Sequence, residues 1–267
     1  MMGTPLKWHG GKHYLARRII DLMTGHTHYV EPYAGGLSVL LTRDPEGVSE
    51  VANDINGELV NFWQVLRDPA WFSDFVRAAE ATPFCEYVWH SASRMEPDGC
   101  TSPVTRALAF FVHCRQSLAG RMKAFTGITK TRTRRGMNNE VSAWLTAVEG
   151  LPAVHARLRR VLILNRPALE VIQSQDGPDT LMYLDPPYLS ETRSAPDVYA
   201  HEMTAEQHAD LLELVTTCKG KVMLSGYRSA LYDSRLGQWN RHDFDIANHA
   251  AGGDSKRRMT ECVWCNF

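Results

Sequence analysis

The residues around the first pair of glycines constrain the fold of this chain most strongly. The run from Thr27 to Tyr33 predicts a β-strand, and the run from Leu37 to Leu41 predicts the start of a helix directly after Gly35 and Gly36. A strand, a glycine-containing loop and a helix, in that order, form the repeating unit of doubly wound α/β sheets. Because glycine has no Cβ, the loop backbone can approach a ligand closely. The unit therefore predicts a ligand site at this loop.

An acidic residue follows the next predicted strand, Val48–Asn53. Asp54 lies 19 positions after Gly35, and in doubly wound folds an acid at a spacing of roughly 20 residues binds the ribose hydroxyls of a nucleotide. Asp54 is therefore a candidate for the ribose of a cofactor. Alternatively, Asp54 caps the helix expected from Glu58 to Leu66, and the two roles are compatible. Neither a P-loop nor a G-x-G-x-x-G pattern is present, which argues against a nucleotide triphosphatase.

A second motif, Asp185-Pro186-Pro187-Tyr188, follows the apolar run Leu181–Leu184. Ligands of open α/β sheets bind at the carboxyl ends of strands. The two prolines favour an extended, rigid backbone with outward carbonyl groups. A carboxylate, a carbonyl and an aromatic ring suit the planar exocyclic amine of a nucleobase. The alternative is a proline-rich turn that only ends a strand.

The remaining pattern predicts an α/β fold, with a doubly wound, Rossmann-like sheet and an inserted, mainly helical lobe. At 267 residues, of which 44% are apolar, the chain is long enough for a substantial core and a smaller lobe. We expect the sheet domain to comprise residues 1–60 and 160–267, and the helical lobe residues 61–159. Further strands are expected at Val161–Leu164, Lys221–Leu224, Arg241–Ile246 and Cys262–Phe267, and further helices around Pro167–Gln173, Thr204–Cys218 and Ser229–Leu236.

Positive charge is concentrated in one part of a nearly neutral chain. The formal net charge is −1, yet residues 100–139 contain eight Lys and Arg residues and no Asp or Glu. Such a segment favours binding to the phosphate backbone of a nucleic acid. The alternative is a run of charges that only contacts solvent. Arginine and glutamine can read bases in the major groove, whereas the stretch 129–137 is predicted to be a loop that orders on DNA. The candidate DNA-binding residues are Arg115, Gln116, Ser117, Arg121, Lys123, Lys130, Arg132, Arg134 and Arg135.

Composition excludes several other classes of protein. No run reaches the roughly 18 apolar residues of a membrane span, and the N-terminus lacks the core of a signal peptide. The six cysteines show no framework spacing, so we expect a soluble protein in a reducing, cytoplasmic compartment. Cys262 and Cys265 face opposite sides of an expected strand, and His26 and His28 have no nearby acids. No metal site is expected from either pair.

Three motifs together resemble one family. The segments Lys7-Trp8-His9-Gly10-Gly11-Lys12 and 29–36, followed by the Asp-Pro-Pro-Tyr motif, resemble the Dam-type (D12 class, alpha-group) DNA adenine-N6 methyltransferases. The resemblance covers nearly the whole chain and is strongest at residues 5–60 and 180–190. Residues 85–165 are more similar to phage or prophage members. The Arg-Gln-Ser-Leu-Ala-Gly run from Arg115 departs from the Dam pattern, so the GATC target does not carry over.

The resemblance implies a mechanism. The cofactor is S-adenosylmethionine, which leaves as S-adenosylhomocysteine, and no metal takes part. The substrate is adenine, flipped out of double-stranded DNA; its amine donates to Asp185 and to the carbonyl of Pro186, and Tyr188 stacks on the ring. The implied catalytic motif is Asp185, Pro186, Pro187 and Tyr188, and the implied cofactor-binding residues are Trp8, Gly10, Gly11, Lys12, Glu31, Pro32, Tyr33, Ala34, Gly35, Gly36, Asp54, Ile55, Asn165 and Asp185.

Two alternatives belong to other functional classes. A related enzyme would methylate the N4 amine of cytosine or an amine in RNA, because any planar exocyclic amine fits the motif. A catalytically inert, sequence-specific DNA-binding protein would not need Lys12, Asp54, Asp185 and Tyr188 together. We expect a monomer in a bacterial cell, encoded by the bacterium, a phage or a prophage. The sequence leaves open the recognition site and any role in restriction and modification.

Overall fold

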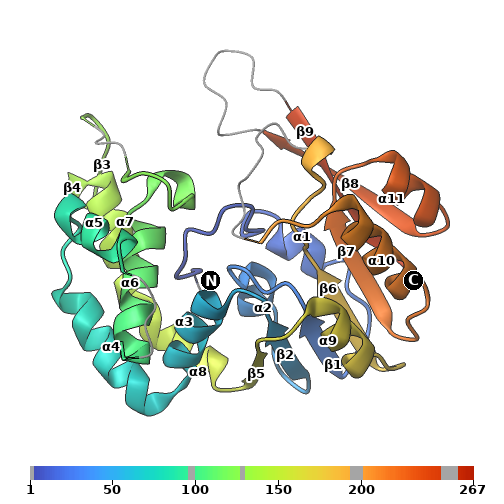
Figure 1. The fold of residues 1–267 in the computed structure, drawn as a ribbon, viewed down its shortest axis with the longest axis horizontal. Coiled ribbons are helices and arrows are strands. Elements are labelled where there is room, and N and C mark those ends of the chain that lie inside the picture. Colours follow the sequence, from blue (N-terminus) through green and yellow to red (C-terminus); the bar gives the residue numbers. More distant parts are fainter. Residues whose placement is uncertain (1–2, 96–99, 127–129, 193–200, 248–257) are drawn as a thin grey trace. The chain divides into compact units, whose positions relative to one another are not determined.

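The computed structural model describes residues 3–95, 100–126, 130–192, 201–247 and 258–267 (Figure 1). The chain forms two compact units. The first comprises Met1–Leu22, Gly35–Asp44 and Asn56–Asn165, and the second comprises Met23–Ala34, Pro45–Ile55 and Arg166–Phe267. The chain passes from one unit to the other inside the glycine loop, between Ala34 and Gly35. Each unit therefore carries a part of the predicted motifs.

A mostly parallel sheet is the main β-structure. It has seven strands in the order β5-β2-β1-β6-β7-β9-β8. β1 pairs in parallel with β2 and β6, and β6 pairs in parallel with β7. β9 pairs antiparallel with both β7 and β8. The strands are β1 (His28–Glu31), β2 (Ser49–Asn53), β5 (Val161–Leu164), β6 (Thr180–Leu184), β7 (Lys221–Gly226), β8 (Asn240–Ala247) and β9 (Arg258–Cys265). The predicted α/β fold is confirmed.

The second unit is built around β6, all five residues of which are buried. Parallel strands that are covered on both faces have continuous apolar sequences, and this explains the run from Leu181 to Leu184. Helix α10 begins with a capping box, in which the Thr204 hydroxyl accepts from the Gln207 N–H and the Gln207 side chain accepts from the Thr204 N–H. The helices of this unit are η2 (Ser190–Thr192), α9 (Ala168–Gln175), α10 (Ala205–Thr216) and α11 (Ala230–Arg235).

The first unit is mainly helical, and aromatic rings fill its core. Phe62 stacks on Phe111 with ring centroids 5.7 Å apart, and Trp144 lies 5.0 Å from Phe111 on the same criterion. These rings come from α3, α6 and α7, so they join helices that are distant in the sequence. The elements are α1 (Ala16–Ile20), α2 (Ser38–Thr42), α3 (Gly57–Arg67), α4 (Pro69–Ala81), α5 (Glu86–Ser93), α6 (Pro103–Arg115), η1 (Leu118–Gly120), β3 (Thr133–Arg134), β4 (Met137–Asn138), α7 (Asn139–Glu149) and α8 (Leu151–Leu158).

The structure corrects two local predictions. Asn56, not Asp54, caps α3, because its side chain accepts from the N–H groups of Glu58 and Leu59 at 3.1 Å. The stretch 129–137, predicted as a loop, contains β3 and the first residue of β4, and these two strands pair antiparallel. Residue 129 itself lies outside the described residues. Among the described helices, none is long and apolar enough to cross a membrane.

Candidate active site

The Asp-Pro-Pro-Tyr motif begins where β6 ends. Because β6 is parallel to both β1 and β7, the carboxyl ends of these three strands meet at one edge of the sheet. Asp185 is half-buried there, whereas Pro186 and Tyr188 are buried. The prolines prevent the strand from continuing, since proline cannot donate to the ladder. The motif therefore holds a carboxylate at the edge where ligands of α/β sheets bind.

The hydroxyl of Tyr188 lies between two carboxylates. It is within hydrogen-bonding reach of both, as a donor to Glu261 of β9 and, at 3.3 Å, to Oδ1 of Asp185. Burial raises the pKa of Tyr188 well above its ordinary value, and Asp185 and Glu261 raise it further. Tyr188 therefore stays a neutral phenol near neutral pH. The sequence motif gives no sign of Glu261, which lies far after it in the sequence and belongs to another strand.

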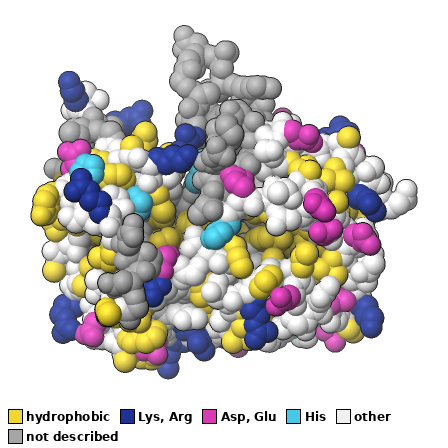
Figure 2. Space-filling model, viewed as in Figure 1, with side chains coloured by type: hydrophobic (Ala, Val, Ile, Leu, Met, Phe, Trp, Pro, Cys, Tyr) yellow, Lys and Arg dark blue, Asp and Glu magenta, His cyan; other side chains and the backbone are white. Residues whose placement is uncertain are grey.

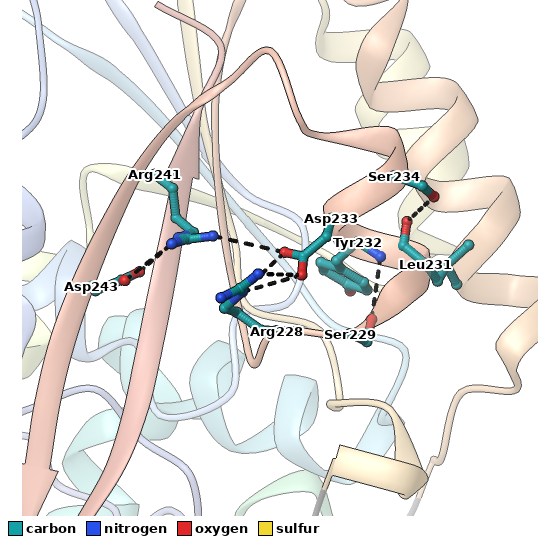
Figure 3. A network of polar contacts seen from close by, with 8 residues as sticks. All are labelled: Arg228, Ser229, Leu231, Tyr232, Asp233, Ser234, Arg241 and Asp243. Atoms are coloured by element: carbon teal, nitrogen blue, oxygen red, sulfur yellow. Dashed lines mark hydrogen bonds and ion pairs between the residues drawn. The ribbon is translucent and has the colours of Figure 1, made fainter.

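The loop after β7 packs against the motif. The ring of Tyr227 meets the ring of Tyr188 edge-on, with centroids 4.8 Å apart. The next residue, Arg228, pairs with Asp233 of α11 at 2.9 Å, and Asp233 lies 3.8 Å from Arg241 of β8 (Figure 3). These contacts join the loop to a helix and a strand. They hold Tyr227 in place beside Tyr188.

Polar side chains also gather at the carboxyl ends of β1 and β2. The buried carboxylate of Glu31 accepts a hydrogen bond of 2.8 Å from the Tyr29 hydroxyl. Asn53, which is fully buried, donates to the carbonyl of Pro32 at 2.9 Å and accepts from the N–H of Arg166 at 2.9 Å. Asn53 thus holds the loop Pro32–Ala34 against the start of the segment after β5. We did not predict this role from the sequence, although the position of Asn53 at a strand end was a usable signal.

Asp54 lies beside Tyr33 in the second unit. Burial raises the pKa of Tyr33, and the charge of Asp54 raises it further. Burial also raises the pKa of Tyr232, and Tyr33 and Asp185 raise it further. These couplings place the loops after β1, β2 and β6 at the same edge of the sheet. Since Asp54 does not cap α3, its half-buried carboxylate remains a candidate for binding ribose hydroxyls.

In the first unit, the glycine loop packs on Trp8. Gly35 has φ of +45°, and a Cβ on it would lie 2.7 Å from the indole Nε1 of Trp8. A Cβ on Gly36 would lie 2.8 Å from the Cβ of Trp8. Only glycine fits both positions without movement of Trp8. Lys12 is buried, and its ammonium donates to the carbonyl of Gly10 at 2.8 Å. The predicted segments 8–12 and 35–36 therefore form one packed loop cluster.

Comparison with known proteins identifies the family. A family model described as D12 class N6 adenine-specific DNA methyltransferase matches residues 8–246. The chain belongs to this family. It is also similar to the Type II methyltransferase M1.LlaDCHI of Lactococcus lactis subsp. cremoris, with 26% identity over 279 residues, which cover 98% of this chain and 94% of that protein. As a member of the D12 class, the chain described here is a methyltransferase that acts on the N6 amine of adenine in DNA. The family implies S-adenosylmethionine as the methyl donor.

The two units carry the predicted site residues of the methyltransferase separately. The second unit brings together Glu31, Tyr33, Asp54, Asp185 and Tyr188. It also contains Pro32 and Ala34, in the loop that Asn53 holds, and Ile55, which is exposed after Asp54. The first unit brings together Trp8, Gly10, Gly11, Lys12, Gly35 and Gly36. Asn165 is exposed in the first unit, and its Oδ1 lies 3.8 Å from the position that a Cβ of Gly57 would take.

Acidic residues from elsewhere in the chain neutralise part of the positive charge of the basic segment, residues 100–139, although the segment itself contains no Asp or Glu. Arg106 forms an ion pair with Glu58, and Arg135 binds Glu149 through two hydrogen bonds of 2.9 Å. Acidic residues from other helices thus oppose part of the charge of residues 100–139. Figure 2 shows Lys and Arg side chains mixed with Asp and Glu on the face that it draws. Arg121, Lys123, Lys130, Arg132 and Arg134 are exposed.

The part of this segment expected to read bases is folded into the first unit. Gln116 is fully buried, accepts from the N–H of Cys85 at 3.0 Å and donates to the carbonyl of Pro83 at 3.1 Å. Ser117 is also buried, and its hydroxyl donates to the carbonyl of Cys114. Arg115 donates to the carbonyl of Ala143 at 2.7 Å, and burial lowers its pKa. These three side chains hold the end of α6 in place. Gln116 and Ser117 do not reach the surface, where we expected them, and Arg115 is half-buried.

Proposed function

We propose that this methyltransferase transfers a methyl group from S-adenosylmethionine to the N6 amine of an adenine that is flipped out of duplex DNA. The observation that supports this most directly is the carboxylate of Asp185, held half-buried at the carboxyl end of β6 beside the Tyr188 hydroxyl. A flipped base needs acceptors for its amine and an aromatic face. The motif offers both.

The residues of the motif have separate roles in this proposal. The lone pair of the adenine amine is delocalised into the ring, which makes the amine a poor nucleophile. Hydrogen bonds from its two protons to Asp185 and to the carbonyl of Pro186 draw the lone pair back to the nitrogen and orient it. Asp185 also takes up a proton after transfer, and Pro187 keeps the backbone rigid between the two acceptors and Tyr188.

The carboxylates of the second unit are acceptors that suit the hydroxyl and ammonium groups of S-adenosylmethionine. When bound, S-adenosylmethionine supplies an electrophilic methyl group. Asp54 would accept from the ribose hydroxyls, and Glu31 and the loop Pro32–Ala34 would approach the methionine portion. A contact of the cofactor with Ile55, which is apolar and exposed, is expected from the family resemblance. For the first unit, contacts of the cofactor with Trp8, Gly10, Gly11, Lys12, Gly35, Gly36 and Asn165 remain predictions from the family resemblance.

Replacing Asp54 by alanine is expected to weaken the affinity for S-adenosylmethionine about tenfold or more, because a charge-assisted hydrogen bond contributes roughly 1.5–3 kcal/mol. Asp210→Ala removes an exposed carboxylate from α10 and serves as the control. Isothermal titration calorimetry measures both affinities. An unchanged affinity in Asp54→Ala, equal to that of the control, would remove Asp54 from the cofactor site.

We further propose that residues 61–159 recognise the DNA target and that the hairpin β3–β4 contacts phosphates. Arg132 and Arg134 support this role, since both are exposed and neither forms an ion pair with a described residue. Arg121, Lys123 and Lys130 extend the same exposed basic segment. Arg135 contributes less, because Glu149 already neutralises it.

The double variant Arg132→Ala/Arg134→Ala is expected to weaken binding to every duplex about equally. The slope of log K against log salt should become shallower by about 0.9 for each lost phosphate contact. The matched control, Arg67→Ala/Arg159→Ala, removes the same charge from exposed positions of the first unit outside the segment. Binding is measured by fluorescence anisotropy between about 50 and 200 mM salt, a range over which phosphate contacts lose much of their affinity. Equal slopes for the two double variants would show that Arg132 and Arg134 contact solvent and not the phosphates of DNA.

A further inference from the structure

The hairpin β3–β4 is too short to hold its own shape. It pairs two residues of each strand, and Arg135 and Gly136 form the turn between them. Both turn residues have positive φ, +57° and +73°, as a two-residue hairpin turn requires. An arginine in this conformation is uncommon, and isolated two-stranded hairpins are only marginally stable in water. The order of this hairpin must therefore come from its contacts with the rest of the first unit.

Helix α7 lies beside the hairpin and provides these contacts (Figure 1). At the base of the hairpin, the N–H of Asn139 donates to the carbonyl of Arg132 at 3.1 Å. At its tip, the guanidinium of Arg135 donates to both carboxylate oxygens of Glu149 at 2.9 Å and lies 3.4 Å from the hydroxyl of Thr146. Thr146 and Glu149 are three residues apart, so they lie on the same face of α7. The hairpin is thus attached to one helix at both of its ends.

Glu149 occupies a position that its own helix does not favour. It is the last residue of α7, where the negative end of the helix dipole repels a carboxylate and attracts a cation. Arg135 brings a cation to this end, and its hydrogen bonds lower the pKa of Glu149, so the carboxylate is ionised near neutral pH. Two parallel N–H···O bonds also make the geometry of such a pair specific. The contact with the hairpin, and not the stability of α7, therefore accounts for Glu149.

The hold on the tip determines how the neighbouring arginines are presented. Arg132 and Arg134 flank Thr133, so they share one face of β3, and both are exposed. We propose that Glu149 is a positioning residue that fixes the tip of the hairpin on α7 and so presents Arg132 and Arg134 to the DNA backbone as a preorganised pair. The inference rests on the proposed contact of the hairpin with phosphates. A hairpin that is ordered before binding loses less conformational entropy when DNA binds.

Hydrogen exchange of the free, full-length protein tests the hold on the hairpin. Glu149→Ala is expected to speed exchange of the backbone amides of residues 130–138 by about two- to fivefold, the range that corresponds to the loss of an exposed ion pair. Glu80→Ala is the matched control, because it removes an exposed carboxylate from the last turn of α4 in the same unit. The charge swap Arg135→Glu/Glu149→Arg should bring the rates back toward those of the parent. Unchanged exchange in Glu149→Ala would overturn the proposal.

DNA affinity as a function of salt tests what the hold is for. Compared with Glu80→Ala, the variant Glu149→Ala should bind duplex DNA about two- to fivefold more weakly. The slope of log K against log salt should stay the same, because no phosphate contact is lost. Tighter binding with a slope steeper by about 0.9 would overturn the proposal, since Arg135 would then be a phosphate contact that Glu149 blocks.

The double variant Arg132→Ala/Arg134→Ala, measured alongside, tests the proposed function separately. If its slope equals that of the parent, the hairpin does not contact phosphates, and the proposed function of the hairpin fails. If its slope becomes shallower while Glu149→Ala binds DNA as tightly as Glu80→Ala, the hairpin does contact DNA and the positioning role of Glu149 is overturned.

Discussion

Asp185→Ala is expected to lower the rate of methyl transfer by about 10²–10⁴-fold, the range typical of a positioned acid–base group. Asp185 lies at the end of β6, half-buried and 3.3 Å from the Tyr188 hydroxyl. Its removal takes away the carboxylate that accepts the amine proton, while the ribose-binding candidate Asp54 stays in place. The affinity for S-adenosylmethionine should therefore change much less than the rate.

Single-turnover transfer and calorimetric affinity are measured on the same preparations of Asp185→Ala. Asp185→Asn is the informative companion, because it keeps one acceptor oxygen and should lose less of the rate. Asp210→Ala, an exposed position on α10, controls for the loss of a carboxylate. Transfer by Asp185→Ala within about tenfold of the parent would remove Asp185 from the catalytic role.

Gly120→Ala is expected to destabilise the protein by more than about 4 kcal/mol, an exceptional value for one substitution. Gly120 has φ of +69°, and a Cβ built on it would overlap the backbone carbonyl of Lys7. A backbone oxygen cannot turn away as the end of a flexible side chain can. Because Lys7 precedes Trp8, the substitution should disturb the cofactor loop cluster together with the segment after α6.

Gly136→Ala is the matched control for this prediction. Gly136 has nearly the same conformation, with φ of +73°, but a Cβ there meets no atom within 4 Å. It should cost only about 1–2 kcal/mol, the left-handed penalty of a residue that has a Cβ. Chemical denaturation measures both free energies of unfolding. Equal destabilisation by the two variants would mean that the backbone conformation of Gly120, and not its contact with Lys7, determines the effect.

The strand ends were predictable because their signals are local. The apolar run before Asp185 marks a strand that is buried on both faces, and prolines end it. The glycine loop was equally readable, since Gly35 adopts a positive φ that favours glycine. The resemblance to the family then followed from three short motifs, and the family model confirms it.

Other parts of the site depend on contacts between distant segments. Glu261 meets Tyr188 only because β9 pairs antiparallel with β7, and no local pattern specifies that pairing. Gln116 looked suited to base reading, but it packs against the chain around Pro83 and Cys85. Likewise, residues 100–139 contain no acidic residue, but in the fold Arg135 forms an ion pair with Glu149 of α7. Residue type indicates what a side chain can bind, and the tertiary fold decides what is within its reach.

Analysis of the product nucleoside tests the central claim most directly. Duplex DNA of mixed sequence is incubated with the protein and isotope-labelled S-adenosylmethionine, digested to nucleosides and analysed by mass spectrometry, with Asp185→Ala as the parallel control. We predict that the label appears in N6-methyladenine with the parent protein and is strongly reduced with Asp185→Ala. Label in N4-methylcytosine, or transfer to RNA in preference to duplex DNA, would contradict the account.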